Sequence, residues 1–186
     1  MSDKLGEVKA TSFTLCGNDG NARASLFLRE GDPQFVIADD EGRVRVSLSV
    51  DGAGNSRFLM ADAAGNARIG MDCYDDGPSF FVRDSSGSLR IGLDYTEETG
   101  TALVTLASAG ERTRLSLTCS TDDDSARITL LDGGGRKRIE IRSQGDAHTI
   151  SFINEKSIVE TLIAANSLGV MSSGKVRFIT CSDAET

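Results

Sequence analysis

Residues 80–93, FFVRDSSGSLRIGL, decide the fold, because similar stretches recur along the 186-residue chain. The recurrences are FTLCGNDGNARASL (13–26), FVIADDEGRVRVSL (35–48), FLMADAAGNARIGM (58–71), VTLASAGERTRLSL (104–117) and ITLLDGGGRKRIEI (128–141). They follow one another at intervals of 22 to 24 residues. A fixed internal period is the signature of a repeat architecture, so the chain is predicted to be an array of similar units.

Each copy has a turn signal and an arginine at a constant offset. The residues that open the turns are Gly17, Asp39, Asp62, Asp84, Ser108 and Asp132. A glycine follows most of them after three residues, at Gly20, Gly42, Gly65, Gly87 and Gly135. An arginine follows all of them after six residues, at Arg23, Arg45, Arg68, Arg90, Arg114 and Arg138. Asp opening a turn and Gly three positions later favour a tight turn, so each copy is predicted to be a β-hairpin.

The length of the hairpin loop decides which side chains share a face of the sheet. An even loop puts the alternating apolar residues of both strands on one face, and we expect four residues built on a type I turn. The predicted apolar interface face comprises Phe35, Ile37, Phe58, Met60, Phe80, Val82, Ile91 and Leu93. The opposite face carries the arginines beside small residues such as Ser47, Gly70 and Gly92, which would let the arginine stems lie across the sheet.

The predicted fold is all-β, a meander of antiparallel hairpins with an apolar face too wide to stay in water. We expect several copies to bring these faces together as an oligomeric β-prism or fibre, with a homotrimer favoured. A monomeric β-sandwich or flattened barrel is the alternative, and a propeller is a third possibility. The regular repeats, which show no switch in pattern, and an aromatic content of only 5% favour the oligomer.

Three segments are expected along the chain: a polar tail over residues 1–10, a hairpin-repeat domain of six repeats over 11–146, and a divergent C-terminal cap over 147–186. Within the cap, HTISFIN (148–154) is typical of a strand. The stretch SIVETLIAANSLG (157–169) is compatible with a helix, because Ser157 and Glu160 could form a capping box, or with a strand rich in β-branched residues.

Composition limits the function. The net charge of −8 argues against nucleic-acid binding, which needs a basic surface. No apolar run is long enough for a membrane helix and no signal peptide is recognisable, so we expect cytoplasmic synthesis, with membership of a larger particle or an unconventional export route as alternatives. Cys16, Cys73, Cys119 and Cys181 lie far apart and are expected to be free, buried thiols.

The sequence has no recognisable catalytic, cofactor or metal motif. His148 is the single histidine, so any Ser-His or Cys-His mechanism would have to use it, and we expect a structural histidine. Carboxylates at the turns are expected to be solvated, with calcium binding as the alternative. The arginine ladder is expected to be a structural device that fixes register, with anion binding as the alternative. The turn carboxylates are Asp39, Asp40, Asp62, Asp75, Asp76, Asp122, Asp123 and Asp124.

We therefore expect a non-enzymatic structural or interaction protein, a self-associating β-repeat module that serves as a fibre, spike or scaffold element. Its partners would be further copies of itself and other assembly proteins at its ends, with no nucleic acid, cofactor or membrane insertion. The alternative is a monomeric module that binds a carbohydrate or small anionic ligand through its inter-hairpin loops or its arginine face.

Overall fold

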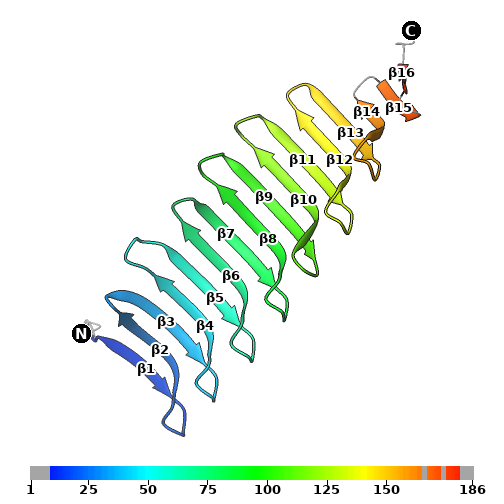
Figure 1. Cartoon of the computed structure of the whole chain (residues 1–186). Helices are drawn as coiled ribbons and strands as arrows, with labels where there is room; N and C mark the ends of the chain where they lie inside the picture. The colour runs from blue at the N-terminus through cyan, green and yellow to red at the C-terminus, as the bar shows by residue number, and fades with distance from the viewer. Residues whose placement is uncertain (1–8, 165–166, 173–174, 181–186) are drawn as a thin grey trace, which may run out of the picture. The chain divides into compact units, whose positions relative to one another are not determined.

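Repetition of one hairpin produces the architecture seen in a computed structural model of the chain, which describes residues 9–164, 167–172 and 175–180. The described residues form sixteen β-strands and no helix (Figure 1). By its internal contacts the chain divides into an N-terminal unit, Met1–Tyr74, and a C-terminal unit, Asp75–Thr186. The expectation of an all-β hairpin meander is confirmed.

The strand bounds follow the repeat. The N-terminal unit contains β1 (Ser12–Cys16), β2 (Ala22–Arg29), β3 (Asp32–Ala38), β4 (Val44–Val50), β5 (Ser56–Ala61) and β6 (Ala67–Tyr74). The C-terminal unit contains β7 (Gly77–Arg83), β8 (Leu89–Thr96), β9 (Thr101–Ser108), β10 (Arg112–Ser120), β11 (Ser125–Leu131), β12 (Lys137–Gln144), β13 (Ala147–Ile153), β14 (Val159–Ala164), β15 (Ser167–Ser172) and β16 (Lys175–Thr180).

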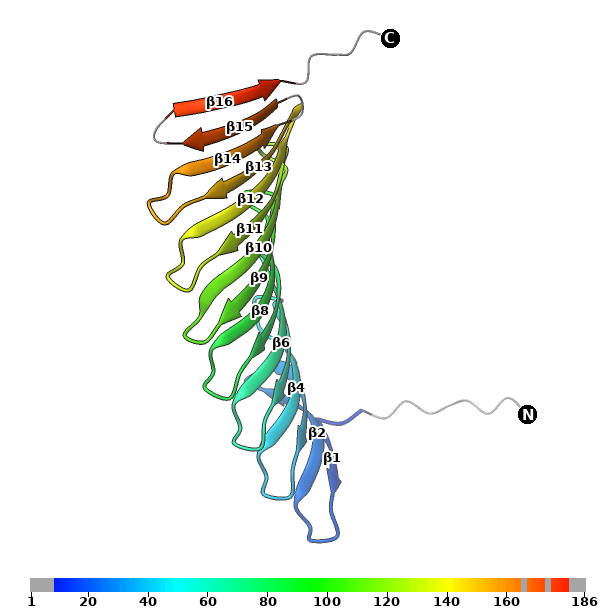
Figure 2. The same cartoon turned by 90° about the vertical axis from the view of Figure 1, so that its right-hand side faces the viewer.

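Within each unit the strands form a single antiparallel layer in sequence order. In the C-terminal unit β8 pairs with β7 and β9, and the same neighbour pairing continues to β16 (Figure 2). Among the described residues of each unit, no strand pairs with any but its sequence neighbours, so neither sheet closes on itself. For each unit taken alone, the flattened-barrel alternative is therefore wrong. The sandwich alternative is wrong as well, because no hydrophobic side chain whose burial is described is buried, as a core between two layers requires.

The hairpin turn is a three-residue loop and not the expected four-residue loop. Asp39 N–H donates to the carbonyl of Arg43 at 3.0 Å, and Gly42 N–H donates back to the carbonyl of Asp39 at 3.1 Å. Gly42 has φ of 79°, a left-handed conformation that favours glycine. This is a type I turn followed by a left-handed residue, the usual three-residue hairpin loop. The same bonds recur at Asp62, Asp84 and Asp132.

The repeat arginine is an extra residue in its strand. In the second hairpin Ala38 lies opposite Val44, whereas Ile37 lies opposite Val46, so Arg45 has no partner in the register. Such a two-against-one β-bulge shifts the pairing by one residue. The shift restores the even register that the odd loop alone would destroy. The same bulge occurs at Arg23, Arg68, Arg90, Arg114 and Arg138.

The predicted division of side chains between faces is therefore correct, although the predicted loop length is wrong. Phe35 lies opposite Leu48, and Leu48 lies opposite Phe58. In the C-terminal unit Phe80 lies opposite Leu93, and Val82 lies opposite Ile91. Directly paired residues point to the same side of a sheet, so one face of each unit is apolar.

A seventh hairpin extends the repeat into the predicted C-terminal cap. Asn154 opens its turn, Ser157 takes the glycine position with φ of 62°, and Glu160 occupies the bulge in place of arginine. Val159–Ala164 is strand β14, so the helical alternative for this stretch is wrong over these residues. Residues 165–166, which the alternative also covered, lie outside the described residues.

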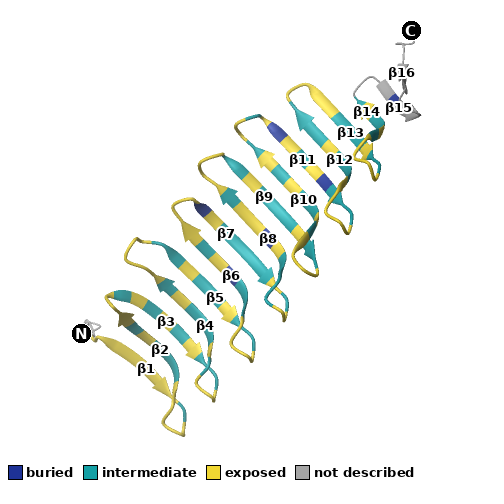
Figure 3. Cartoon of the chain, viewed as in Figure 1, coloured by how far each residue is buried: buried dark blue, intermediate teal, exposed yellow. Residues whose placement is uncertain are grey.

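Neither face is covered within a unit. In the part of the chain whose burial is described, no hydrophobic side chain is buried (Figure 3). Many large residues of the apolar face are 37–50% exposed along the central strands, for example Phe35 at 37% and Met71 at 50%, and others, such as Phe58 and Phe80, are half-buried. Cys16, Cys73 and Cys119 are free, as expected, but exposed, so the expectation of buried thiols is wrong for these three. Cys181 lies outside the described residues.

Gly135→Ala is expected to lower the free energy of unfolding by about 1 kcal/mol, because Gly135 has φ of 79° and a Cβ is disfavoured there. Gly133→Ala is the matched control in the same turn, because Gly133 has no left-handed φ and a Cβ there meets no atom within 4 Å. Urea unfolding measures both. Equal stability of the two variants would contradict the turn assignment.

Ser157→Gly is expected to raise the free energy of unfolding by about 0.5–1 kcal/mol, since it relieves a left-handed conformation that serine adopts reluctantly. The comparison is Ser172→Gly, at the end of strand β15, where glycine is expected only to weaken the strand. A loss of stability in Ser157→Gly would show that the seventh turn is not built like the others.

Candidate functional site

The carboxylate that opens each turn organises the backbone around it. Asp39 Oδ1 accepts hydrogen bonds from the N–H groups of Glu41 and Arg43 at 3.1 and 2.9 Å. Asp62, Asp84 and Asp132 accept the corresponding pairs of backbone bonds. These carboxylates are therefore structural parts of the turn, which is the first role that sequence analysis gave them.

The bulge aims five of the six ladder arginines, all but Arg114, at the turn of their own hairpin. Arg90 contacts Asp84 at 2.5 Å and Arg138 contacts Asp132 at 2.6 Å. In the N-terminal unit Arg68 lies 3.1 Å from Asp62, and Arg45 lies 3.6 Å from Asp39. Where the first turn opens on Gly17, Arg23 pairs with Asp19 instead, at 2.7 Å. Bulges commonly redirect a side chain in this way.

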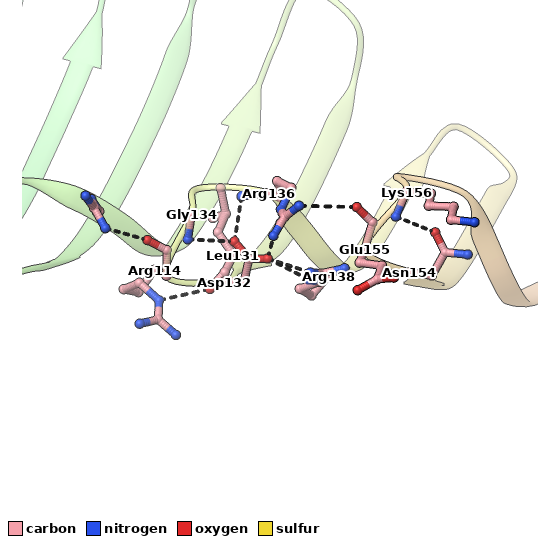
Figure 4. A network of polar contacts seen from close by, with 11 residues as sticks. Arg114, Leu131, Asp132, Gly134, Arg136, Arg138, Asn154, Glu155 and Lys156 are labelled. Atoms are coloured by element: carbon pink, nitrogen blue, oxygen red, sulfur yellow. Dashed lines mark hydrogen bonds and ion pairs between the residues drawn. The ribbon is translucent and has the colours of Figure 1, made fainter.

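Arginines also join each hairpin turn to the next. Arg114 Nε donates to the carbonyl of Leu131 at 2.9 Å, and Arg112 donates to the carbonyl of Gly133 at 2.9 Å, on either side of Asp132. Arg136 continues the chain of contacts to the carbonyl of Glu155 at 3.4 Å (Figure 4). Equivalent contacts run from Arg23 to Asp39 and from Arg90 to Ala107. The ladder thus fastens consecutive turns.

Sequence analysis missed a second set of side chains that serve the turns. Four residues after the opening residue stand Arg43 and Arg136, whose Nε atoms lie 3.0 and 3.2 Å from the carboxylates of Asp39 and Asp132. The position holds a polar residue in all six predicted repeats, including Asn21, Asn66, Ser88 and Arg112, whereas the seventh hairpin has Ile158 there. That regularity is a signal that could have identified it.

The turn environment stabilises the ionised form of these aspartates. The hydroxyl of Ser86 is the largest influence that lowers the pKa of Asp84 to about 2, with backbone bonds and Arg90 adding to it. For Asp132 the backbone N–H of Arg136 is the largest influence that lowers the pKa, followed by other backbone bonds and Arg138. The backbone bond from Asn66 chiefly lowers the pKa of Asp62. Carboxylates held this way accept bonds and do not exchange protons near neutral pH.

The ladder has little capacity left for a free anion. The guanidinium groups of the bulge arginines contact aspartates or turn carbonyls in the described hairpins. Arg45, Arg127 and Arg142 each keep a buried Nε that has no hydrogen-bond partner. Two of these, Arg127 and Arg142, lie directly opposite each other in β11 and β12, and Arg127 pairs with Asp123 at 2.9 Å. The geometry favours the structural role over the anion-binding alternative.

The apolar face is the larger feature. Over β10–β14 it is hollowed into an open groove of about 750 Å³. Paired residues form its floor, in the order Leu117, Ile128, Ile141, Ile150 and Ile163 across the five strands. Phe80, Val82, Ile91 and Leu93 continue the same kind of surface on β7 and β8. A face of this composition can bury itself against another apolar surface.

His148 lies at the edge of the groove without a catalytic partner set. Its Nδ1 is 3.0 Å from the hydroxyl of Ser143 on the neighbouring strand. Among the described residues it bonds to no carboxylate, which a Ser-His-Asp arrangement requires. No group of three or more His, Cys, Asp or Glu side chains suited to hold a metal ion occurs in the described part. No helix that could cross a membrane is found there either.

Comparison with known proteins gives no family. No family model matches the sequence, and no curated protein matches it. Among solved structures, a porin-like protein from Bacteroides uniformis matches 84% of this chain and 91% of its own length, with 8% sequence identity and a TM-score of 0.22. At that TM-score the likeness carries no argument about function.

Ser86→Ala is expected to raise the pKa of Asp84 above about 2, because it removes the hydroxyl that most strongly favours the carboxylate. Since the folded-state pKa lies below the ordinary aspartate value of 3.8, the stabilisation from Asp84 is complete above that value and is lost as pH falls toward 2. Carbon-13 NMR titration of the side-chain carboxyl measures it. Ser85→Ala, next to it in the turn, serves as control, and an equal effect of both would refute the assignment.

Proposed function

We propose that the chain is a non-enzymatic structural protein, a β-repeat module that assembles with further copies of itself through its apolar face. The observation that carries the proposal is the lack of any buried hydrophobic side chain in the described part of a chain that is 39% hydrophobic. A sheet with one apolar face must cover that face with another layer to fold stably. Neither unit supplies such a layer from its own strands.

The size of the face suits a stable interface. Ten strands spaced by about 4.8 Å, each about seven residues long, give the C-terminal unit a face of roughly 1,100 Å². A stable protein interface buries about 800 Å² per partner. The apolar face of this unit therefore exceeds what a stable pairing with a second copy needs.

A second copy is the partner whose surface matches best. Rows of Leu, Ile, Val and Phe repeat from strand to strand, as in Leu106, Leu93 and Ile91 on β9 and β8. An identical face offers the same spacing, so side chains of two copies can interdigitate as they do between packed sheets. An unrelated partner would need to reproduce that spacing.

A homotrimer is the favoured assembly. Three sheets whose strands span about 24 Å would enclose an axis about 7 Å from each face. Medium-sized aliphatic side chains from three sides can fill an interior of that depth. The chain is poor in bulky aromatic residues, with 5% of Phe, Trp and Tyr, which fits such an interior. Such a prism, extended along its axis, would serve as a fibre, spike or scaffold element, alone or attached to other assembly proteins at its ends.

The alternative function is that of a monomeric ligand-binding module. It would use the inter-hairpin loops or the arginine face for a carbohydrate or a small anion. The bulge arginines already bond to aspartates and turn carbonyls, which disfavours the arginine face as the ligand-binding site. The two functions differ in the expected mass in solution. A monomeric module has a mass of 19.7 kDa and a trimer about three times that, which light scattering behind a sizing column measures.

Leu106→Asp is expected to dissociate the oligomer, because Leu106 lies on the apolar face with 40% exposure and a charge buried at an interface costs several kcal/mol. Thr105→Asp is the matched control on the same strand, since Thr105 lies in the next register row, opposite Gly92 and Ser116, on the other face. Light scattering should give the wild-type mass for the control only. Dissociation of both variants, or of neither, would contradict the interface.

A further inference from the structure

The two ends of the strands in the C-terminal unit carry opposite charge. The turn edge is defined by the hairpin turns β7–β8, β9–β10, β11–β12 and β13–β14 with the first or last three strand residues beside them. The loop edge is defined in the same way by the connections at the other ends of β7–β14. Because the strands are antiparallel neighbours in sequence order, all hairpin turns lie on one edge of this sheet (Figure 1).

The turn edge is basic within residues 75–164. It has eight cationic and five acidic side chains, a net charge of +3: Arg83, Arg90, Arg112, Arg114, Arg136, Lys137, Arg138 and Lys156 against Asp84, Glu111, Asp132, Glu155 and Glu160. Asp84 and Asp132 are held in the turns by arginines and backbone N–H groups. The exposed side chains of this edge are six cations and three carboxylates: Arg83, Arg112, Arg114, Arg136, Lys137 and Lys156 against Glu111, Glu155 and Glu160. Its outward surface is therefore net cationic.

The loop edge is strongly acidic. It has nine carboxylates and two arginines, a net charge of −7: Asp75, Asp76, Asp94, Glu97, Glu98, Asp122, Asp123, Asp124 and Asp146 against Arg127 and Arg142. Arg127 is already paired with Asp123. Glu97, Glu98, Asp122 and Asp146 are exposed. The N-terminal unit shows no such segregation, because both ends of its strands carry mixed charge.

We infer that the acidic loop edge of one copy docks against the basic turn edge of the next copy, head to tail. This inference rests on the proposed self-association and specifies how the copies are arranged. A rotation axis that runs across the strands brings the loop edge of one sheet to the turn edge of its neighbour. An axis parallel to the strands would instead bring acid to acid and base to base, which like-charge repulsion disfavours. Head-to-tail contacts that close on themselves form rings, as a three-sided prism requires.

Charge reversal tests the contact in the full-length chain. The acidic-edge variant carries Glu97→Lys, Glu98→Lys and Asp122→Lys, and the basic-edge variant carries Arg112→Glu, Arg136→Glu and Lys156→Glu. The acidic-edge variant reduces the loop-edge charge from −7 to −1 against a turn edge of +3, so it loses most of the attraction between copies. The basic-edge variant changes the turn-edge charge to −3 against a loop edge of −7, so attraction becomes repulsion. The dissociation constant of each variant is expected to rise about tenfold or more. The sixfold variant, which carries both sets, keeps the wild-type net charge and has edges of −1 and −3. Because most of the repulsion is removed, it is expected to associate about tenfold or more tightly than the basic-edge variant.

A control separates edge contact from net charge. Glu30→Lys, Asp40→Lys and Glu41→Lys change the charge of the N-terminal unit by the same amount as the acidic-edge variant, and should leave dissociation unchanged. Rising salt should also weaken wild-type assembly and strengthen that of the basic-edge variant, as measured by sedimentation. Circular dichroism checks that all variants keep their strands.

The outcomes distinguish the contact from the assembly itself. If the wild-type chain forms an oligomer and both single-edge variants dissociate at the same concentration as the wild type, the head-to-tail contact is wrong. Self-association is unaffected by that result. A sixfold variant that associates no more tightly than the basic-edge variant overturns the contact as well, because the losses would then be unrelated to the charges of the two edges. A wild-type chain that stays at 19.7 kDa overturns the proposed function and the contact together.

Discussion

The structure depends on one extra residue in each hairpin. A three-residue turn closed by Asp and a left-handed Gly would give an odd loop, and the apolar residues of the two strands would fall on opposite faces. The bulge at Arg45 adds the missing residue, so Phe35 and Ile37 share a face with Leu48 and Val46. Repetition of that bulge in the hairpins from β1–β2 to β13–β14 gives each unit a continuous apolar face.

The same residue that corrects the register also fixes the turn. A bulged side chain is redirected from the regular pleat, and arginine is long enough to reach the turn carboxylate and the next turn. Arg138 contacts Asp132, while Arg114 bonds to the carbonyl of Leu131 beside it. Exposed ion pairs contribute little stability singly. Their value here is geometric, because a slipped register would separate the paired arginines, such as Arg90 and Arg138, from their aspartates.

Self-assembly explains two features of the C-terminal unit together. One is an apolar face that no strand of the unit covers, and the other is a pair of edges with opposite charge. The apolar face provides the free energy for association, since burial of apolar area drives it without setting direction. The charges at the strand ends provide direction, because only a head-to-tail arrangement pairs the acidic edge with the basic edge. Within this proposal the two features have separate roles, one in affinity and one in geometry.

The sequence by itself determined the repeat, the hairpins, the apolar face and the residues of the arginine ladder. These depend on local turn chemistry and on alternation along a strand, which a single repeat already contains. Only the tertiary structure decided that the loop has three residues, that the arginine is the bulged residue, and that Val159–Ala164 is a strand. Loop length and bulge compensate each other in the side-chain pattern, so the sequence is consistent with either. The strand at Val159–Ala164 follows from pairing with β13, a contact that its own residues do not specify.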